Sequence, residues 1–233
     1  MISKYNAYID SLIQLTDAQK EQLYIYFETL VEVSKVMNLT TIIEEEDVYI
    51  KHFYDSILVL SKEESLDGKT FLDIGSGAGF PGLVLKIVFP NLKITLLEPT
   101  KKRCDFLNLV IDKLGLTDIV VVNERAENYI KNKRETFDFA SARAVANLSV
   151  LSELSLGFVK VGGYFMSMKG ASFEEEIADA KNAISTLGGE IERIFQYKLP
   201  HDEGTRAIIK IKKIKKTKQE YPRAYAQIKK KPL

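Results

Sequence analysis

Residues 70–82 read TFLDIGSGAGFPG, and this stretch decides the fold of the chain. It joins a short apolar run, Thr70 to Leu72, through a turn with four glycines to a second apolar run, Leu83 to Phe89. That layout predicts a strand, a glycine-rich turn and the start of a helix. Because glycine has no Cβ, the backbone of such a turn can lie directly against a bound molecule. The stretch therefore indicates an α/β domain that binds a nucleotide-like ligand.

The composition indicates one large folded unit. With 233 residues, 45% of them hydrophobic, the chain can bury one large core and a small appended subdomain. No apolar run approaches the roughly 20 residues of a membrane span, and the first residues lack the pattern of a signal peptide. The single cysteine, Cys104, excludes an internal disulfide, and His52 and His201 lack metal-ligand spacing. These features predict a soluble cytoplasmic protein without a structural metal.

The charge of the chain is strongly segregated. Residues 210–233 hold ten Lys and Arg side chains and one acid, Glu220, so they carry a net charge of +9. The remaining residues hold 23 basic and 31 acidic side chains, a net charge of −8. Such segregation favours an anionic partner such as nucleic acid. A solvated tail that keeps the protein soluble is the alternative that the sequence leaves open.

Three regions follow from the patterns along the chain. Residues 1–65 have helical periodicity and a capping box from Thr16 to Gln19, which predicts a helical N-terminal cap. Residues 66–213 alternate short apolar strands with helices, which is typical of a mostly parallel, doubly wound sheet. Residues 214–233 are predicted to be a basic C-terminal tail.

The central region predicts a specific α/β fold. Its expected strands are 70–75, 93–98, 119–122, 137–141 and 162–168. Its expected helices are 80–89, 100–114, 124–131, 147–157 and 172–187, the last beginning with a capping box from Ser172 to Glu175. No helix fits between 190–198 and 205–213, which predicts an antiparallel hairpin at the sheet edge. This pattern resembles the Rossmann-like, seven-stranded sheet of class I methyltransferases that use S-adenosyl-L-methionine (AdoMet).

Two acidic residues near the glycine turn narrow the choice of ligand. Glu98 ends the second expected strand, where a carboxylate can accept hydrogen bonds from both ribose hydroxyls of NAD or AdoMet. Asp73 would repel a pyrophosphate but could bind the α-ammonium group of a methionine moiety. Capping of the turn is the alternative role for Asp73. The G-x-G-x-x-G run from Gly77 to Gly82 fits either cofactor and is a weak signal by itself.

The next two strand ends carry further polar groups. Strand 119–122 is followed by Asn123 to Glu127, where an acid or amide can bind the adenine amino group and the Ala126 backbone can contact the ring edge. Acids are also favoured in any first helical turn, so this signal is ambiguous. Arg143 follows the fourth strand and can hold a phosphate, a guanine O6 edge or a methionine carboxylate. It offers only donors and cannot act as a base; its alternative role is a surface salt bridge.

Several motifs together resemble one known family. The run from Asp73 to Gly82, the triplet Arg125-Ala126-Glu127 and the run Ser141-Ala142-Arg143-Ala144 resemble the bacterial small-subunit rRNA guanine-N7 methyltransferases, also called glucose-inhibited division protein B. Further matching segments are Asn38-Leu39-Thr40, His52 with Asp55-Ser56, Lys169-Gly170, Tyr221-Pro222-Arg223 and Lys231-Pro232-Leu233. The resemblance extends from about residue 38 to Leu233, and the combination is far more specific than any one motif.

The resemblance implies transfer of a methyl group from AdoMet to N7 of guanine 527 in 16S rRNA. It places cofactor contacts on Gly75, Phe80, Ala126, Glu127 and Arg143, to which the strand and turn positions add Asp73, Gly77 and Glu98. No catalytic base is expected, because N7 of guanine has a free lone pair and no proton to lose. The partner would be 16S rRNA or a 30S ribosomal particle, and the default oligomeric state is a monomer.

The basic segment is the predicted RNA contact. Lys212, Lys213, Lys215 and Lys216 would meet phosphates, and Tyr221 and Tyr225 would stack on bases. The roles of His52 and Asp55 stay open.

Four other functions are weighed against this one. A nicotinamide-dependent oxidoreductase is disfavoured by Asp73, by the terminal hairpin and by the lack of an obvious proton donor. A methyltransferase acting on another RNA site and a non-catalytic RNA-binding or assembly protein with the same fold remain alternatives. The basic segment argues against a protein or a metabolite as the substrate of methylation.

Overall fold

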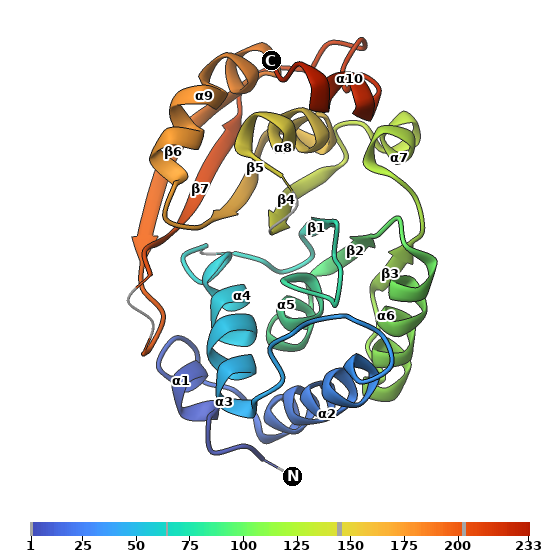
Figure 1. Ribbon diagram of the computed structural model, residues 1–233, viewed down its shortest axis with the longest axis vertical. Helices are drawn as coiled ribbons and strands as arrows, with labels where there is room; N and C mark the ends of the chain where they lie inside the picture. The colour runs from blue at the N-terminus through green and yellow to red at the C-terminus, as the bar shows by residue number, and fades with distance from the viewer. Residues whose placement is uncertain (1, 64, 144–145, 202–203) are drawn as a thin grey trace.

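The computed structural model describes residues 2–63, 65–143, 146–201 and 204–233, and one seven-stranded sheet forms its centre (Figure 1). The strand order is β3-β2-β1-β4-β5-β7-β6. The strands are β1 (Thr70–Ile74), β2 (Lys93–Leu97), β3 (Ile119–Val122), β4 (Phe137–Arg143), β5 (Val159–Lys169), β6 (Gly189–Tyr197) and β7 (Arg206–Lys213). β1 to β5 pair in parallel, whereas β7 is antiparallel to both β5 and β6. The predicted class I methyltransferase fold with its terminal hairpin is therefore confirmed.

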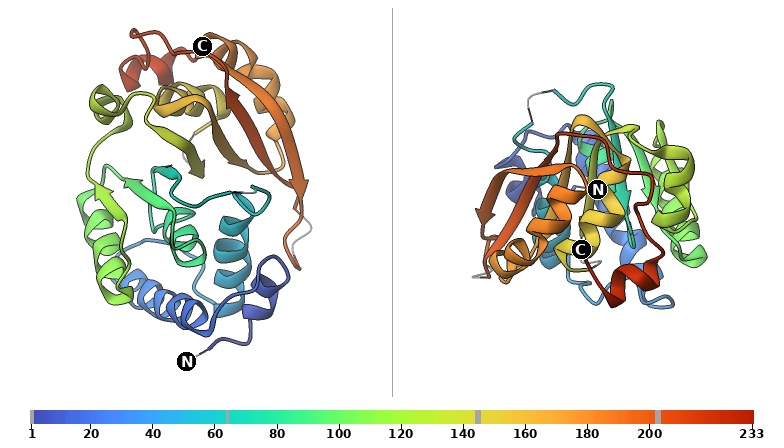
Figure 2. Two further views of the ribbon diagram at one scale, coloured as in Figure 1. Left: turned by 180° about the vertical axis from the view of Figure 1, so that it is seen from behind. Right: turned by 90° about the horizontal axis from the view of Figure 1, so that it is seen from above.

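Helices cover both faces of the sheet (Figures 1 and 2). One face carries α1 (Asn6–Asp10), α2 (Asp17–Ser34), α3 (Glu45–Val48), α4 (Asp55–Leu58), α5 (Gly82–Val88) and α6 (Lys101–Leu114). A π-helical stretch, Tyr49–Tyr54, joins α3 to α4. The other face carries α7 (Ala126–Lys133), α8 (Leu148–Ser155), α9 (Phe173–Thr186) and α10 (Tyr225–Lys230). Because both faces are covered, the central strands β1 and β4 are almost wholly buried, as in other parallel sheets.

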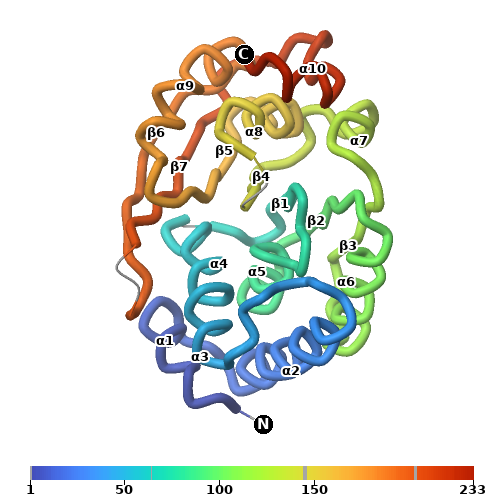
Figure 3. Tube along the Cα trace, in the orientation of Figure 1, coloured from blue at the N-terminus to red at the C-terminus, as the bar shows by residue number. Residues whose placement is uncertain are grey.

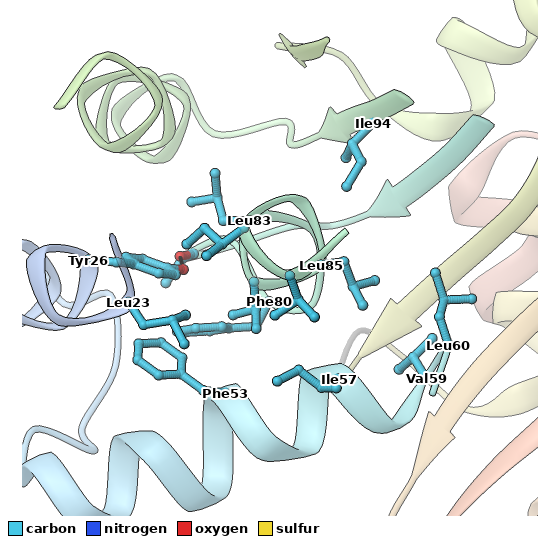
Figure 4. Close-up of a cluster of buried hydrophobic side chains, with 14 of the residues drawn as sticks. Leu23, Tyr26, Phe53, Ile57, Val59, Leu60, Phe80, Leu83, Leu85 and Ile94 are labelled. Carbon is cyan, nitrogen blue, oxygen red and sulfur yellow. Dashed lines mark hydrogen bonds between the residues drawn. The ribbon is translucent and has the colours of Figure 1, made fainter. Parts of the chain in front are cut away.

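The N-terminal helices share one hydrophobic core with the sheet. Leu23 and Tyr26 of α2 pack with Phe53 and with Leu83 of α5, and all four side chains are fully buried (Figure 4). The predicted capping box at Thr16 is confirmed, because its hydroxyl accepts a hydrogen bond from the Gln19 amide and Gln19 Oε1 accepts one from the Thr16 amide. The Gln19 side chain also donates to the carbonyl oxygens of Ile87 and Val88. The cap thus ties the start of α2 to the end of α5.

The second predicted capping box is wrong. Ser172 precedes α9, but its ψ of 19° differs from the extended backbone of a normal N-cap, and its side chain makes no capping hydrogen bond. The amide of Phe173 instead donates to the carbonyl oxygen of Gly170. The backbone of the turn before α9 therefore satisfies the amide of the first helical residue.

Residues 214–233 are a packed segment rather than a solvated tail. The chain leaves β7 and ends beside α8 and α10, at the end of the molecule opposite the N-terminus (Figure 3). Ile228 of α10 is fully buried, and Thr217 is buried with its hydroxyl donating to the Leu187 carbonyl oxygen. Arg223 pairs with Glu153 of α8, whose side chain is buried. These contacts make the segment part of the core on this face.

Candidate functional site

The candidate site lies where the order of the strands reverses. β2 and β4 flank β1 on opposite sides, and the helices that follow β1 and β4, α5 and α8, lie on opposite faces of the sheet. Ligands of open α/β sheets bind in the crevice at the carboxyl ends of such strands. Two pockets line it and meet at Gly75 and Pro99. The Arg143 pocket, about 390 Å³, also contains Glu98 and His52. The Tyr225 pocket, about 160 Å³, is bounded by the start of α7 and by α10.

The glycine turn needs glycine for both backbone and space. Gly75, Gly77 and Gly79 have φ angles of +71°, +57° and +98°, which side chains of L-residues rarely adopt. A Cβ on Gly79 would lie 2.4 Å from Leu83 Cδ1 and 2.7 Å from the Tyr26 hydroxyl oxygen. The turn is therefore held against α2 on one side while it faces the crevice on the other.

Glu98 links the turn to the end of β2. Its Oε2 accepts a hydrogen bond from the Gly77 amide at 2.9 Å, and its Oε1 accepts one from the Thr100 amide at 2.9 Å. The residue is 1% exposed and lines the Arg143 pocket. Each carboxylate oxygen has a second lone pair, so both remain able to accept from a ribose hydroxyl. The position fits the predicted ribose contact.

Asp73 occupies the turn-capping role that the sequence left as the alternative. It is fully buried, and its Oδ2 accepts a hydrogen bond from the Gly82 amide at 2.9 Å. Its Oδ1 has no hydrogen-bond partner among the described residues, and burial raises the pKa of the carboxyl group to about 7. Asp73 lines neither pocket. The predicted contact with an α-ammonium group thus stays a prediction that this geometry does not favour.

Arg143 forms a buried cluster rather than the surface salt bridge considered as its alternative. Its side chain is 18% exposed, and it donates to the Lys51 carbonyl oxygen at 3.2 Å and to Asp55 Oδ2 at 3.3 Å. The guanidinium group also lies 4.9 Å from the ring centroid of Phe80. These contacts bring β4, the glycine turn and the N-terminal helices together at the pocket. Ala144, the last residue of the motif, lies outside the described residues.

His52 is a pocket residue to which the sequence assigned no role. Its ring stacks on Phe80 with centroids 4.3 Å apart, and its Nε2 lies 3.0 Å from Thr40 Oγ1. Burial, followed by the nearby Arg143 charge, lowers its pKa to about 3. Its Nδ1 lies 3.2 Å from a guanidinium nitrogen of Arg143, which can only donate, and 3.2 Å from the Lys51 carbonyl oxygen, which can only accept. His52 and Asp55 are three residues apart in one helical stretch, a spacing that places both on one face.

Asp55 sits behind Arg143 at the centre of a polar network. It is 1% exposed, accepts a hydrogen bond from the Tyr197 hydroxyl at 2.7 Å, and lies 3.5 Å from a guanidinium nitrogen of Arg206. Two cations and one hydroxyl therefore satisfy this buried carboxylate. The network fixes the position of Arg143 from behind the pocket.

The Tyr225 pocket brings Ala126 and Glu127 opposite the C-terminal segment. Both residues begin α7 just beyond β3 and line the pocket together with Gly75, as predicted for one end of a cofactor site. Leu97 and Tyr225 line the same pocket. Sequence reasoning missed Tyr225 as a pocket residue, because it lies about a hundred positions from Ala126 in a segment predicted to be a tail. Its half-buried ring packs against the apolar cluster of this face and lines the pocket.

The lysines at the end of β7 do not flank the crevice. In the antiparallel pair of β5 and β7, Lys169 is opposite Ala207 at the crevice end, and Tyr164 is opposite Lys212 farther from it. Lys212 and Lys213 therefore lie toward the opposite ends of the strands, away from the crevice. Lys213 is also fully buried and donates to the Leu156 carbonyl oxygen. The expectation that Lys213 contacts RNA phosphates is wrong, because the side chain is used inside the fold.

The described residues contain no group of three or more His, Cys, Asp and Glu side chains that could hold a metal ion. No helix in the described ranges is both long and apolar enough to cross a membrane.

Comparison with known proteins assigns a family. The model of the GidB family, described as rRNA small subunit methyltransferase G, matches residues 19–217. A protein of Lactobacillus acidophilus named ribosomal RNA small subunit methyltransferase G is 45% identical over 236 aligned positions, covering 100% of this chain and 96% of that protein. The protein of the same name from Leuconostoc citreum is 49% identical, covering 96% of this chain and 95% of its own length.

Solved structures resemble the chain in fold. A precorrin-6y C5,15-methyltransferase from Geobacter metallireducens superposes with a TM-score of 0.52 at 17% identity, over 68% of this chain and 86% of that chain. A 16S rRNA (adenine(1408)-N(1))-methyltransferase from Catenulisporales acidiphilia, solved with cosubstrate SAM, gives a TM-score of 0.53 at 15% identity, over 66% and 88%. At these identities the likeness supports the fold alone.

Proposed function

Because the chain belongs to the GidB family, rRNA small subunit methyltransferase G, we propose that it transfers a methyl group from AdoMet to N7 of guanine 527 in 16S rRNA. The observation that carries the proposal is the crevice at the carboxyl ends of β1 and β4, where the glycine turn, Glu98 and Arg143 meet. AdoMet supplies an activated methyl group bound to a positively charged sulfur.

The crevice residues fit that cofactor. The free lone pairs of the Glu98 carboxylate suit the two ribose hydroxyls. The bare backbone of Gly75 and Gly77 allows the cofactor to lie against the turn, and the Arg143 guanidinium would hold the carboxylate of the methionine moiety. The start of α7, with Ala126 and Glu127, would receive the adenine ring. These assignments, including Asp73 behind the turn, are proposals for mutagenesis.

The polar groups of the site suit a target atom that loses no proton. Methylation at N7 turns guanine into a cation, so the reaction calls for alignment and charge stabilisation, not for a base. His52 agrees with this, because a pKa of about 3 makes it a poor base. Alignment alone can lower a barrier by roughly 7–11 kcal/mol. Phe80, which stacks with both His52 and Tyr26, would keep the wall of the pocket rigid for that alignment.

The RNA-facing surface is proposed to include α10. Lys229 and Lys230 are exposed on this helix, whose first residue, Tyr225, lines the crevice. Lysines so placed can meet phosphates that flank a base held in the crevice. We further propose that the protein acts in the cytoplasm as a monomer. Naked 16S rRNA, an assembly particle and the 30S subunit are the substrate forms to compare.

The test uses AdoMet labelled on its methyl group and 30S particles from cells that lack this protein. After incubation, the 16S rRNA is cleaved chemically at N7-methylguanine and the label is mapped. One label at guanine 527 is expected, and a Glu98→Gln variant should lose most of it. Label at another guanine would keep the methyltransferase and reject the site.

A non-catalytic assembly role makes a different prediction. In that case AdoMet would bind in a parallel titration, yet no ribosomal particle or naked rRNA would be labelled. Parallel reactions on all three substrate forms therefore separate a wrong particle from a binding-only protein.

A further inference from the structure

Three contacts anchor the C-terminal segment on the fold, two before Tyr225 in the sequence and one after it. Arg223 binds the buried Glu153 of α8 through its amide, Nε and Nη2, with distances of 2.9, 2.9 and 2.6 Å. Ile228, one turn beyond Tyr225, is fully buried. Arg134 donates to the Tyr221 carbonyl oxygen at 2.6 Å. Tyr225 is therefore held in place by contacts before and after it.

The ring of Tyr225 closes one side of the pocket. The aliphatic part of the lining includes Leu97 at the end of β2, Ala126 at the start of α7 and Leu154 of α8. The charged residues Glu124, Arg125 and Glu127 line the pocket as well. The guanidinium carbon of Arg125 lies 5.9 Å from the Tyr225 ring centroid, within reach of a cation–π contact that helps to orient the ring. An aromatic wall facing aliphatic side chains suits a flat, apolar ring better than a phosphate or a sugar.

We propose that Tyr225 is a cofactor-positioning residue, and that the C-terminal segment docks to supply this aromatic wall for the adenine ring of AdoMet. The inference rests on the proposed function and extends it to a residue outside the methyltransferase sheet. It is based on the continuity of the two pockets, because the Tyr225 pocket meets the Arg143 pocket at Gly75 and Pro99. A cofactor with its ribose at Glu98 then has its adenine on the side of Ala126 and Tyr225.

An RNA base is the competing occupant. The pocket adjoins Ala126 and Glu127, the positions expected to receive adenine, and it lies on the far side of Gly75 from the Arg143 cluster. A base held there would compete with the cofactor. The observations therefore favour the adenine ring, and the experiment includes competition with RNA.

The experiment measures affinities of the full chain by calorimetry. The variants are Tyr225→Ala, Tyr225→Phe and Gln227→Ala, the last being an exposed position on the same helix. The ligands are S-adenosylhomocysteine and methylthioadenosine, which both carry adenosine, although the second lacks the amino-acid part. We expect Tyr225→Ala to weaken both ligands by the same factor, about tenfold, as for other base–aromatic contacts. Tyr225→Phe and Gln227→Ala should stay within about twofold of the wild type, because both keep an aromatic ring at position 225.

A second measurement distinguishes loss of a direct contact with adenine from undocking of α10 in the Tyr225→Ala variant. With ring-labelled tyrosine, a nuclear Overhauser effect between Tyr225 and the adenine H2 or H8 proton of bound S-adenosylhomocysteine is expected in the wild type. Equal affinities of Tyr225→Ala and wild type, or no such effect in the saturated complex, would overturn the inference while leaving the methyltransferase intact. Competition of a short RNA with methylthioadenosine would also overturn it. Failure of the wild type to bind either ligand would reject the proposed function itself.

Discussion

The ion pair between Arg223 and Glu153 offers the sharpest test of how the C-terminal segment is held. The Glu153 side chain is fully buried and Arg223 is 25% exposed. Removing one partner of a buried pair costs about 3–5 kcal/mol, because the other charge is left unpaired. In Arg223→Met the main-chain amide still donates to Glu153 Oε1, so the lower end applies. We expect the free energy of unfolding to fall by about 3 kcal/mol.

The matched variants separate the pair from the packing around it. Glu153→Leu should cost about 1–2 kcal/mol, because the Arg223 amide loses its acceptor while the guanidinium can reach water. The double variant should cost no more than Glu153→Leu alone, since no charge is then buried without a partner. Urea or guanidinium titrations followed by circular dichroism give all three values. Costs that simply add, or an Arg223→Met cost below about 0.5 kcal/mol, would refute the reasoning.

Three further perturbations test other parts of the structure. The folded pKa of His52, about 3, lies below its ordinary 6.5, so its stabilising contribution is complete above pH 6.5 and is lost as pH falls toward 3. Between pH 7 and pH 5, wild-type stability should therefore drop about 2 kcal/mol more than that of His52→Gln, and parallel curves in denaturant titrations would contradict this. Gly79→Ala should lower the free energy of unfolding by about 3 kcal/mol, from overpacking and backbone strain. Gly115→Ala is the control, because Gly115 has φ +60° but no atom within 4 Å of the added Cβ, and it should cost only about 1 kcal/mol. Equal costs in the same titrations would show that contact with Leu83 is unimportant. Arg143→Lys keeps the charge but loses the planar fork that reaches three partners, so kcat/KM for methyl transfer should fall at least about tenfold, and an unchanged rate in the labelled-AdoMet assay would argue against a positioning role.

The central sheet was predictable because its signals are local. Each strand is a short apolar run next to turn residues, and the lack of room for a helix between β6 and β7 predicts their hairpin. The glycine turn and Glu98 follow in the same way, since both stand at strand ends whose location the alternation fixes. The capping box at Thr16 was found because the motif spans only four residues.

The features that were missed or left open depend on contacts between distant segments. His52 and Tyr225 enter the crevice only because the N-terminal helices and α10 pack against the sheet. Lys213 belongs to a basic run by composition, yet one neighbouring carbonyl oxygen and the Thr217 hydroxyl make it an interior residue. For Asp73 the pattern left two roles, and the choice depended on the direction of the Gly82 amide. The capping box at Ser172 was wrongly predicted because the backbone of Ser172 itself, with ψ 19°, is not extended as a cap requires.

The docking of α10 also has a consequence for cofactor binding while the chain is being synthesised. Gly82 and Tyr225 are 143 positions apart, and a ribosome makes the glycine turn long before it makes α10. The sheet can therefore collapse around a crevice that still lacks one wall. If Tyr225 supplies that wall, the nascent protein holds its cofactor weakly until α10 has left the exit tunnel and packed on α8. Cofactor capture then reports that synthesis has passed α10, so chains stalled before it would compete little for AdoMet.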